Sequence, residues 1–473
     1  WRAEDMNYQS PFTNRYGSKE MRTLWSERAR RMIWRRVWIA VAEAQASAGL
    51  VEPDQVEDLK VNAHSIDLKR SYEIEAEIGH DLVAELKTFA EQSPSGGAIL
   101  HWGMTSEDVK DNADVIRQRA ALAILIRELR VLLLAFADKL HEFADLVVMG
   151  YTHLQPAEPT TLGYRFAMYA QDLIHCFDNF VRVHSLLRGK GIRGAVGTAA
   201  PFVEMFEGTE MDAASFEIEV MQSLGIQSHQ ISSQTYPRIQ DYWLLSSLAL
   251  LAAALHKFAF DLRMQQSPGF KTLSESFGEK QVGSSAMPFK RNPVGAEKIC
   301  SLARSVAAST WVSWGNASNS LLERTLDDSA NRRSSIPESF LACDEMLTTC
   351  HSIISNLEID VAGIDQALEY YGPFAATERL LSALVRAGAN RQDMHENVRE
   401  HSMRAWEALK TGEPNSLVDS ICADTAILSF LQPTQIREVM DIGTYIGLAP
   451  ERAREVSKRI TEKFPPPSPE GEG

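Results

Sequence analysis

The chain has 473 residues, of which 44% are hydrophobic and 23% charged, a composition ordinary for a globular protein with a large core. Its length suffices for about three domains. With 63 acidic against 48 basic residues the net charge is −15, which argues against a general affinity for nucleic acid or anionic membranes. An anionic substrate would therefore need a local basic pocket.

The cysteines and the chain ends predict a cytoplasmic protein without a metal site. The five cysteines are scattered and show no zinc-ligand spacing, which is typical of reduced thiols. The segment WRAEDMNYQS has early acids and no apolar run, so we expect no signal peptide. Because the chain begins at Trp1 rather than at methionine, we expect further residues before it. The Pro/Gly-rich tail FPPPSPEGEG is predicted to be disordered.

Two short segments before residue 113 have the pattern of helix starts. EIGHDLVAEL opens an apolar periodic segment at His80, and the simplest interpretation is that Asp81 caps a helix while His80 has no special role. In HWGMTSEDVKDN, Thr105 or Ser106 can cap the helix that follows, with acids in its first turn. The same hydroxyl and N–H groups at a helix N-terminus would also suit a carboxylate or a phosphate.

Long helical patterns dominate the middle of the chain. Apolar residues recur at intervals of three and four from Leu122 to Phe143. The patterns predict helices over 112–146, 160–187, 238–264, 295–317 and 335–357. The third is apolar nearly all round between Tyr242 and Leu255, which indicates burial on all sides at the centre of a bundle that subunits share. This uncharged run is too short to span a bilayer, which takes about 20 residues, so we expect no membrane association.

The segment YTHLQPAEPTT separates the first two of these long helices. Thr160 or Thr161 is a good N-cap for the second helix. A lone histidine in a turn is usually structural. Thr152, His153 and Gln155 are three polar side chains at one helix–helix junction, which weakens the structural interpretation of this histidine.

The segment VGSSAMPFKRNPVGAEK, from Val282 to Lys298, has neither a helical nor a strand period. It lacks the phosphate-loop pattern, so a Walker motif is rejected. A surface linker is the alternative, but glycine and serine give a mobile loop in which Lys290 and Asn292 can hold a carboxylate. The composition therefore predicts a lid.

Two further segments contribute arginines. ERTLDDSANRR, from Glu323 to Arg333, is equally consistent with surface ion pairs and with bidentate binding of a phosphate or carboxylate by Arg324 or Arg333. FTNRYGSKEM offers Arg15 and Tyr16, which by themselves indicate no function.

Runs with period-2 alternation are scarce, so the predicted fold is all-α, built around long antiparallel helices. We expect three helical domains around a central long-helix bundle that assembles into a shared tetramer core. The predicted domains are residues 1–104, residues 105–357 with the irregular loop, and residues 358–473 with the disordered tail.

Taken together, these motifs resemble a known family. GSSAMPFKRNP is similar to the G-S-S-x-M-P-x-K-x-N signature of the fumarase/aspartase superfamily, and THLQPAEPTT and TSEDVKDN resemble its two other signature regions. Within the superfamily, four segments resemble the adenylosuccinate lyases: NRYGSKEM, the His80–Asp81 pair, SSQTYPR and ERTLDDSANRR. The resemblance extends from about Tyr8 to Glu462.

The resemblance implies an elimination that releases fumarate, in purine biosynthesis, from adenylosuccinate to give AMP and from the ribotide SAICAR to give AICAR. It implies Ser284 as general base, His153 as general acid, Lys290 as the cation that favours the serine alkoxide, Glu297 as partner of His153, and His80 in a supporting role. It implies substrate binding by Arg15, Tyr16, His80, Asp81, Thr105, Ser106, Gln234, Asn292, Lys298, Arg324, Ser329 and Arg333. No metal or organic cofactor is implied, and the expected assembly is a homotetramer whose active sites draw on three chains.

Three residues depart from the family pattern. Gly79 stands where some relatives have arginine, Lys298 stands where some carry arginine, and Glu158 replaces a usual glutamine. These changes put phosphate affinity in doubt more than reaction type. Another lyase of the superfamily, of the argininosuccinate lyase or carboxymuconate cycloisomerase type, and a non-enzymatic crystallin-like scaffold stay open as alternatives.

Overall fold

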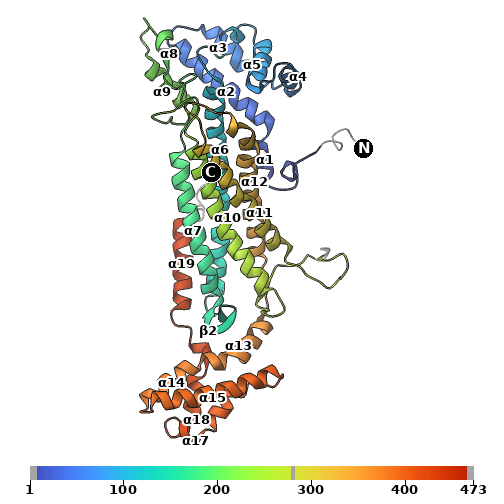
Figure 1. Ribbon diagram of the computed structural model, residues 1–473, viewed down its shortest axis with the longest axis vertical. Helices are drawn as coiled ribbons and strands as arrows, with labels where there is room; N and C mark the ends of the chain where they lie inside the picture. The colour runs from blue at the N-terminus through green and yellow to red at the C-terminus, as the bar shows by residue number, and fades with distance from the viewer. Residues whose placement is uncertain (1–7, 279–282, 466–473) are drawn as a thin grey trace, which may run out of the picture. The chain divides into compact units, whose positions relative to one another are not determined.

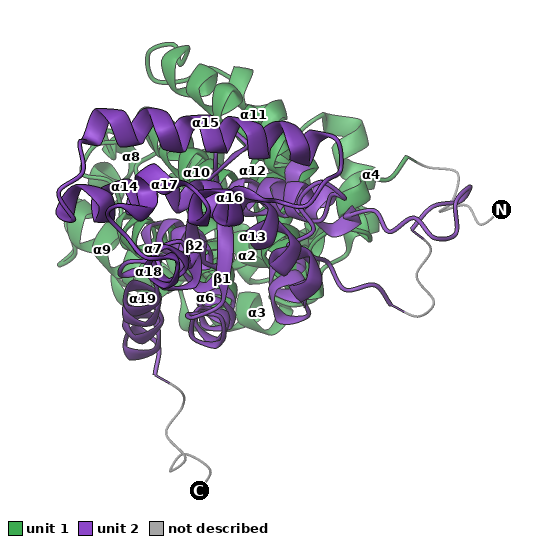
Figure 2. Cartoon of the chain, turned by 90° about the horizontal axis from the view of Figure 1, so that it is seen from below, with its two compact units in different colours: residues 1–129, 176–253, 301–348 green, residues 130–175, 254–300, 349–473 purple. Residues whose placement is uncertain are grey.

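The computed structural model describes residues 8–278 and 283–465. Most of the WRAEDMNYQS segment, Val282 and most of the predicted disordered tail lie outside the described residues. The chain divides into two compact units (Figure 2): unit 1 comprises Trp1–Leu129, Cys176–Ala253 and Ser301–Thr348, and unit 2 comprises Arg130–His175, Ala254–Cys300 and Thr349–Gly473. The predicted three-domain division at residues 104 and 357 stays a prediction.

The long helices occur where the apolar periodicity predicts them, and the all-α prediction is confirmed. They are α6 (Ser106–Glu142), α7 (Leu162–Leu186), α10 (Ile239–Gln265), α11 (Val294–Ser318) and α12 (Asp327–Ser355). Two helices start earlier than their apolar patterns predict: α6 begins at Ser106 rather than at residue 112, and α12 begins at Asp327 rather than at Ser335. Two acids in its first turn stabilise this start, so ERTLDDSANRR is partly helical.

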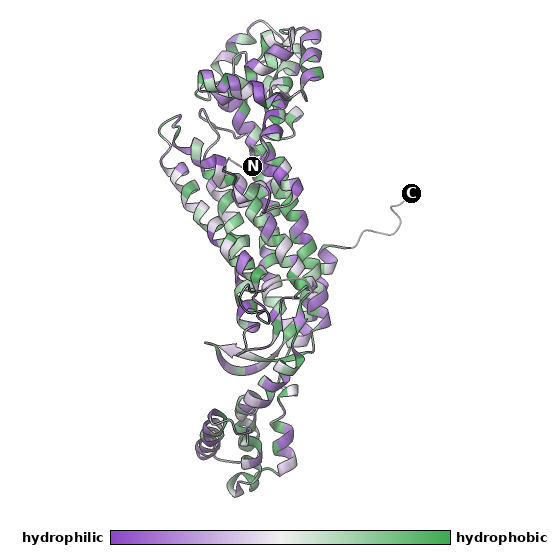
Figure 3. Cartoon of the chain, turned by 90° about the vertical axis from the view of Figure 1, so that its right-hand side faces the viewer, coloured by the Kyte–Doolittle hydropathy of each residue, from purple (hydrophilic) through white to green (hydrophobic). Residues whose placement is uncertain are grey.

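Within unit 1, segments of α6, α10 and α12 lie side by side (Figure 1) and are joined by polar contacts between helices. Gln118 on α6 donates to Asp241 on α10 at 3.4 Å, and Arg332 on α12 donates to the same carboxylate at 2.7 Å. Along the long helices hydrophobic and hydrophilic residues alternate (Figure 3), as amphipathic packing requires.

Unit 1 also contains the shorter N-terminal elements. These are η2 (Pro11–Thr13), α1 (Lys19–Leu24), α2 (Glu27–Ser47), α3 (Pro53–Asn62), α4 (Leu68–Ile78), α5 (Asp81–Gln92), η3 (Gly96–Ile99), α8 (Ala200–Met205) and α9 (Ala213–Leu224). The aromatic rings of Trp38 and Phe89 pack at 6.3 Å in the buried interior between α2 and α5.

Unit 2 contains two small antiparallel sheets and the C-terminal helices. The strands are β1 (Val147–Thr152) paired with β2 (Gln155–Thr161), and β3 (Leu273–Ser274) paired with β4 (Glu358–Ile359). The helices are α13 (Val361–Ala375), α14 (Thr377–Arg386), α15 (Arg391–Lys410), α16 (Leu417–Cys422), α17 (Thr425–Leu428), α18 (Pro433–Val439), η4 (Ile442–Thr444) and α19 (Ala449–Lys463). The segment YTHLQPAEPTT lies between α6 and α7 as predicted, and it forms the end of β1, the turn and β2, a hairpin that the sequence did not predict.

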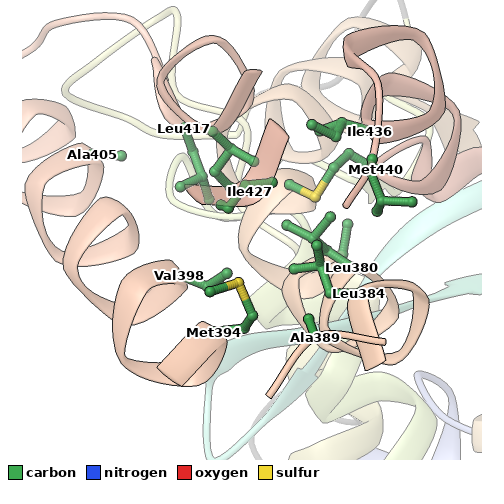
Figure 4. Close-up of a cluster of buried hydrophobic side chains, with 13 residues drawn as sticks. Leu380, Leu384, Ala389, Met394, Val398, Ala405, Leu417, Ile427, Ile436 and Met440 are labelled. Atoms are coloured by element: carbon green, nitrogen blue, oxygen red, sulfur yellow. The ribbon is translucent and has the colours of Figure 1, made fainter. Parts of the chain in front are cut away.

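The C-terminal helices have a hydrophobic core of their own. Leu380 and Leu384 of α14 pack with Ile436 and Met440 of the α18 region, and Leu417 of α16 belongs to the same cluster (Figure 4). Each of these five side chains is at most 5% exposed, so burial of apolar surface holds this part of unit 2 together.

Helix α10 is the one helix of the described chain that is long and apolar enough to cross a membrane by length and composition alone. The uncharged run from Tyr242 to Leu255 is itself shorter than a membrane span, and the expected absence of membrane association stays a prediction. Half of its most apolar window is buried inside the described chain, which is also typical of a core helix. Leu250 and Phe260 on this helix are about half exposed.

Candidate active site

The turn between α4 and α5 places His80 and Asp81. Gly79 ends α4 with φ of 68°, a left-handed conformation that favours glycine. His80 then caps α5, since its Nδ1 accepts the backbone N–H of Val83 at 3.3 Å. The prediction that Asp81 is the cap was wrong, because Asp81 is the first residue of the helix and its carboxylate is only 5% exposed.

The first turns of α6 bind this His80–Asp81 pair. Ser106 Oγ lies 3.4 Å from His80 Nε2, and Lys110 Nζ lies 3.1 Å from Asp81 Oδ1. Because residues four apart share one face of a helix, Ser106 and Lys110 contact adjacent residues of α5. Thr105 precedes the helix and donates its backbone N–H to Asp108 at 2.8 Å.

Asp108 also binds a glycine-rich loop, RGKGIRGAVGT, over residues 188–198. Its carboxylate pairs with Lys190, and both side chains are fully buried. It also accepts the backbone N–H groups of Arg193 at 3.0 Å and Gly194 at 3.1 Å. The loop was not among the predicted site segments. The repeated glycines were the sequence signal that could have identified this loop, because glycine allows left-handed backbone conformations. Gly194, for example, has φ of 72°.

The predicted phosphate-binding residues lie in the first turns of α12 and just before the helix. Arg333 Nη2 donates to Asp81 Oδ2 at 2.8 Å, and Arg324 Nη1 donates to Asp328 Oδ1 at 2.9 Å. A cavity of about 100 Å³ lies within unit 1, and its lining includes Asp81, Glu107, Lys110, Arg324, Ser329 and Arg333. Residues far apart in the sequence thus meet around one cavity.

The charges around this cavity shift two carboxyl groups in opposite directions. Burial works to raise the pKa of Asp81, but Lys110 and Arg333 outweigh it and hold that pKa well below its usual range. Burial, and to a smaller extent repulsion from Asp111, raises the pKa of Glu107 to about 7. The cavity therefore combines a firmly ionised carboxylate with one that gains a proton near neutrality.

Two further predicted binding segments are held in unit 1 by backbone contacts. Gln234 donates its backbone N–H to the carbonyl of Glu323 at 3.2 Å. Glu323 is the residue before Arg324, so this bond ties the Gln234 segment to the Arg324 segment. The Arg15–Tyr16 loop is attached to α12, because Gly17 N–H donates to Glu345 at 3.0 Å. Arg15 is exposed, and the Tyr16 ring packs against Phe12 at 5.6 Å.

In unit 2, His153 lies at the tip of the β1–β2 hairpin. His153 and Leu154 have φ of 56° and 59°, the left-handed values that a two-residue type I′ hairpin turn requires. Such values are unusual for residues other than glycine, so the backbone here is strained. The exposed imidazole borders a pocket of about 750 Å³ within unit 2. Thr161 caps α7 by accepting the N–H of Tyr164 at 3.2 Å, as predicted.

The irregular loop before α11 places Ser284. Its Oγ accepts the backbone N–H groups of Ala286 at 3.3 Å and Met287 at 3.1 Å. Asn292 Nδ2 donates to the carbonyl of Gly283 at 2.8 Å and so joins the two ends of the loop. A Cβ on Gly283 would lie 2.2 Å from the Lys290 carbonyl, so only glycine allows this close approach.

The loop is anchored at the start of α11. The Glu275 carboxylate accepts the N–H groups of Gly295 at 3.1 Å and Ala296 at 2.5 Å, in the first turn of the helix. Lys290 is exposed, and Lys298 is half-buried on α11. Glu297 Oε1 lies 3.9 Å from Arg263 Nη2, and its predicted pairing with His153 stays a prediction.

The predicted site residues thus form two groups. Asp81, Arg324, Ser329 and Arg333 line the cavity of unit 1. The same unit also holds Arg15, Tyr16, His80, Thr105, Ser106 and Gln234. Unit 2 holds His153, Ser284, Lys290, Asn292, Glu297 and Lys298. Over residues 8–278 and 283–465, no group of three or more His, Cys, Asp or Glu side chains could hold a metal ion. The roles of all these residues stay predictions.

Comparison with known proteins covers nearly the whole chain. Residues 15–308 match the family described as Lyase, and residues 373–456 match that described as Adenylosuccinate lyase C-terminus. The adenylosuccinate lyase of Saccharomyces cerevisiae is 35% identical, over 97% of this chain and 96% of that protein. That of Schistosoma mansoni is 37% identical over 94% and 93%, and that of Archaeoglobus fulgidus is 34% identical over 96% and 98%.

Solved structures show the same fold. The 3-carboxy-cis,cis-muconate lactonizing enzyme from Pseudomonas putida superposes with a TM-score of 0.84 at 23% identity, over 95% of this chain and 99% of that one. A fumarate lyase from Mesorhizobium sp. BNC1 gives a TM-score of 0.82 at 21% identity, over 96% and 99%. At such low sequence identity, these structures show that the fold is the same but do not indicate the substrate of this chain.

Proposed function

Because the chain belongs to the adenylosuccinate lyase family, we propose that it cleaves adenylosuccinate to AMP and fumarate, and SAICAR to AICAR and fumarate. The observation that carries this proposal is the similarity to curated adenylosuccinate lyases over 97% of the chain. The reaction is a β-elimination in purine biosynthesis, and its substrates are small nucleotides.

In the proposed mechanism, Ser284 as an alkoxide removes the proton from the succinyl carbon next to a carboxylate. The electron pair of the broken C–H bond moves into that carboxylate and gives a doubly charged aci-carboxylate. Collapse of this intermediate forms the double bond of fumarate and breaks the C–N bond. His153 donates a proton to the departing nitrogen. Lys290 and Asn292, with Thr105, Ser106 and Gln234, bind the succinyl carboxylates and stabilise the added charge.

The contacts of Ser284 support its role as base. A serine hydroxyl is far too weakly acidic in water to act as an alkoxide. The two backbone N–H groups that donate to Ser284 Oγ stabilise its charged form. The positive charge of Lys290, which lies in the same loop, would favour the alkoxide further. Closure of the loop, which would exclude water, would have the same effect.

The unit 1 cavity supports nucleotide binding. Its volume of about 100 Å³ is enough to hold a group of the size of a phosphate. Arg324, Ser329 and Arg333 border it and are the side-chain types that bind phosphate. Arg15 and Tyr16 complete the proposed nucleotide site, His80 assists beside the substrate, and Asp81 and Lys298 bind it.

We further propose a cytoplasmic homotetramer in which each active site draws residues from three chains, with Glu297 of one chain setting the charge of His153. Exposed apolar side chains on the long helices support an interface with further copies of this chain. Trp311 on α11 is 71% exposed and stacks on Trp314 at 4.9 Å, and Phe260 on α10 is 48% exposed.

The test is to offer the purified protein adenylosuccinate and argininosuccinate side by side and to measure fumarate. We expect the protein to release fumarate from adenylosuccinate and none from argininosuccinate. Fumarate from argininosuccinate alone would favour another lyase of the superfamily, and the absence of turnover with either substrate would favour a scaffold. That the reaction needs no metal or organic cofactor stays a prediction, which dialysis of the active protein against a chelator tests.

A further inference from the structure

Lys110 is a cation of the unit 1 cavity that lies within the TSEDVKDN segment but is not among the predicted site residues. It lies on α6 one turn after Ser106, and its side chain is 20% exposed. Its ammonium reaches Asp81 Oδ1 at 3.1 Å, while Arg333 donates to the other oxygen of the same carboxylate at 2.8 Å. The ammonium group therefore faces the residues proposed to hold the nucleotide.

Charge counting shows that this end of the cavity is electropositive. Lys110 and Arg333 together carry a formal charge of +2 and share the single negative charge of Asp81, which leaves +1. Arg324 nearby is paired with Asp328 at 2.9 Å and lies 3.5 Å from Glu107. The N-terminus of α5, which begins at Asp81, adds its positive helix dipole.

The same geometry accounts for the departure at Gly79. A side chain at residue 79 would have to adopt the left-handed φ of 68° that ends α4, a conformation unfavourable for arginine. The chain instead has a lysine on the facing helix, directed at the same α4–α5 turn. The positive charge beside this turn therefore comes from Lys110 on α6.

We propose that Lys110 is a phosphate-binding residue, which together with Arg333 binds the phosphate of the nucleotide in the unit 1 cavity. Asp81 holds the two cations beside each other before the ligand arrives, which reduces the entropy lost on binding. The Arg333 side chain is 47% exposed and lines the cavity beside Lys110, and both cations keep the buried Asp81 carboxylate neutralised. The identity of the nucleotide in this inference rests on the proposed function. The binding of a phosphate group rests on the geometry of the cavity alone.

The test compares the affinities of AMP and adenosine, which differ by the phosphate, in the full-length protein by calorimetry. We expect Lys110→Gln to weaken AMP binding about tenfold to hundredfold, the effect of losing one charge-assisted hydrogen bond, and to leave adenosine binding unchanged. Lys110→Arg keeps the charge and should bind AMP within about fivefold of the wild type. Equal weakening of AMP and adenosine, or unchanged AMP binding, would overturn the proposal.

The matched control is Lys139→Gln. Lys139 lies on the same helix, its side chain is also 20% exposed, and it is paired with Glu142 at 2.8 Å, so its loss should leave both affinities unchanged. A second measurement needs no variant: inorganic phosphate should slow acetylation of Lys110 in the wild-type protein and leave that of Lys139 unaffected. Labelling of Lys110 at the same rate with and without phosphate would contradict the assignment, even if adenylosuccinate proved not to be the substrate.

Discussion

Glu107 Oε1 lies 3.5 Å from Arg324 Nη2, and both side chains border the unit 1 cavity. Glu107 comes directly after Ser106, whereas Arg324 belongs to a segment more than two hundred residues later in the chain. Because burial and the neighbouring Asp111 raise the pKa of Glu107 from 4.5 to about 7, the charge that faces Arg324 changes within the physiological pH range.

Replacing this carboxyl group should change how stability depends on pH. A raised pKa means that the folded protein favours the protonated acid, so the wild type loses stability as pH rises from 4.5 to about 7. Glu107→Gln cannot ionise. We expect its free energy of unfolding, relative to wild type, to increase by roughly 1 to 3 kcal/mol between pH 4.5 and pH 8, measured by urea denaturation. The exposed Glu77→Gln on α4 is the control, and a pH-independent difference for Glu107→Gln would refute the prediction.

The proposed base can be tested within its own loop. Ser284→Ala should reduce fumarate formation by about 10²- to 10⁴-fold, the usual contribution of a general base, while substrate binding and assembly stay intact. The neighbouring Ser285→Ala removes the same hydroxyl from an exposed position of the loop and should retain most of the activity. Turnover of Ser284→Ala at the wild-type rate would remove this serine from the role of base.

The exposed aromatic face of α11 bears on assembly. Trp311→Glu places a charge where we expect another copy to pack, so sedimentation should show dissociation of the proposed tetramer and fumarate formation should fall with it. Val61→Glu on α3 is the control, since Val61 is 70% exposed, close to the 71% of Trp311, and lies away from α10 and α11 in the sequence. An active monomer in either variant would show that the active site is complete within one chain.

The C-terminal core offers a prediction on stability. Leu384 is fully buried in the cluster of Figure 4, so Leu384→Ala should cost about 2 to 5 kcal/mol through lost burial and a cavity. Val385, the next residue, is 43% exposed, and Val385→Ala should change stability by less than about 1 kcal/mol. Thermal denaturation of the two variants checks this, and equal losses would contradict the assignment of α14 to this core.

The sequence was sufficient for the family, the all-α fold and the positions of the long helices. Periodic leucines in α6 and the apolar run in α10 indicate helices because the periodicity of a buried face is a local property. The irregular loop was predicted because Gly283, two serines and Pro293 fit no regular period, and α11 does begin only at Val294.

Local patterns missed one hairpin and misassigned one cap. The β1–β2 hairpin was missed because its turn residues are His153 and Leu154, whose left-handed φ values no common turn signal predicts. His80 was not recognised as the cap of α5, since a histidine ring nitrogen rarely replaces the side-chain oxygen that usually caps a helix.

By itself, the sequence determined which chemical groups are present and on which helices or loops they lie, since motifs and periodicity depend on neighbouring residues. Only the tertiary structure decided which of these groups meet. Asp81 accepts hydrogen bonds from Lys110 and Arg333, residues that are 29 and 252 positions away, and Glu107 lies near Arg324. Such contacts follow from the packing of α5, α6 and α12, and the pKa values of the buried carboxyl groups follow in turn from those contacts.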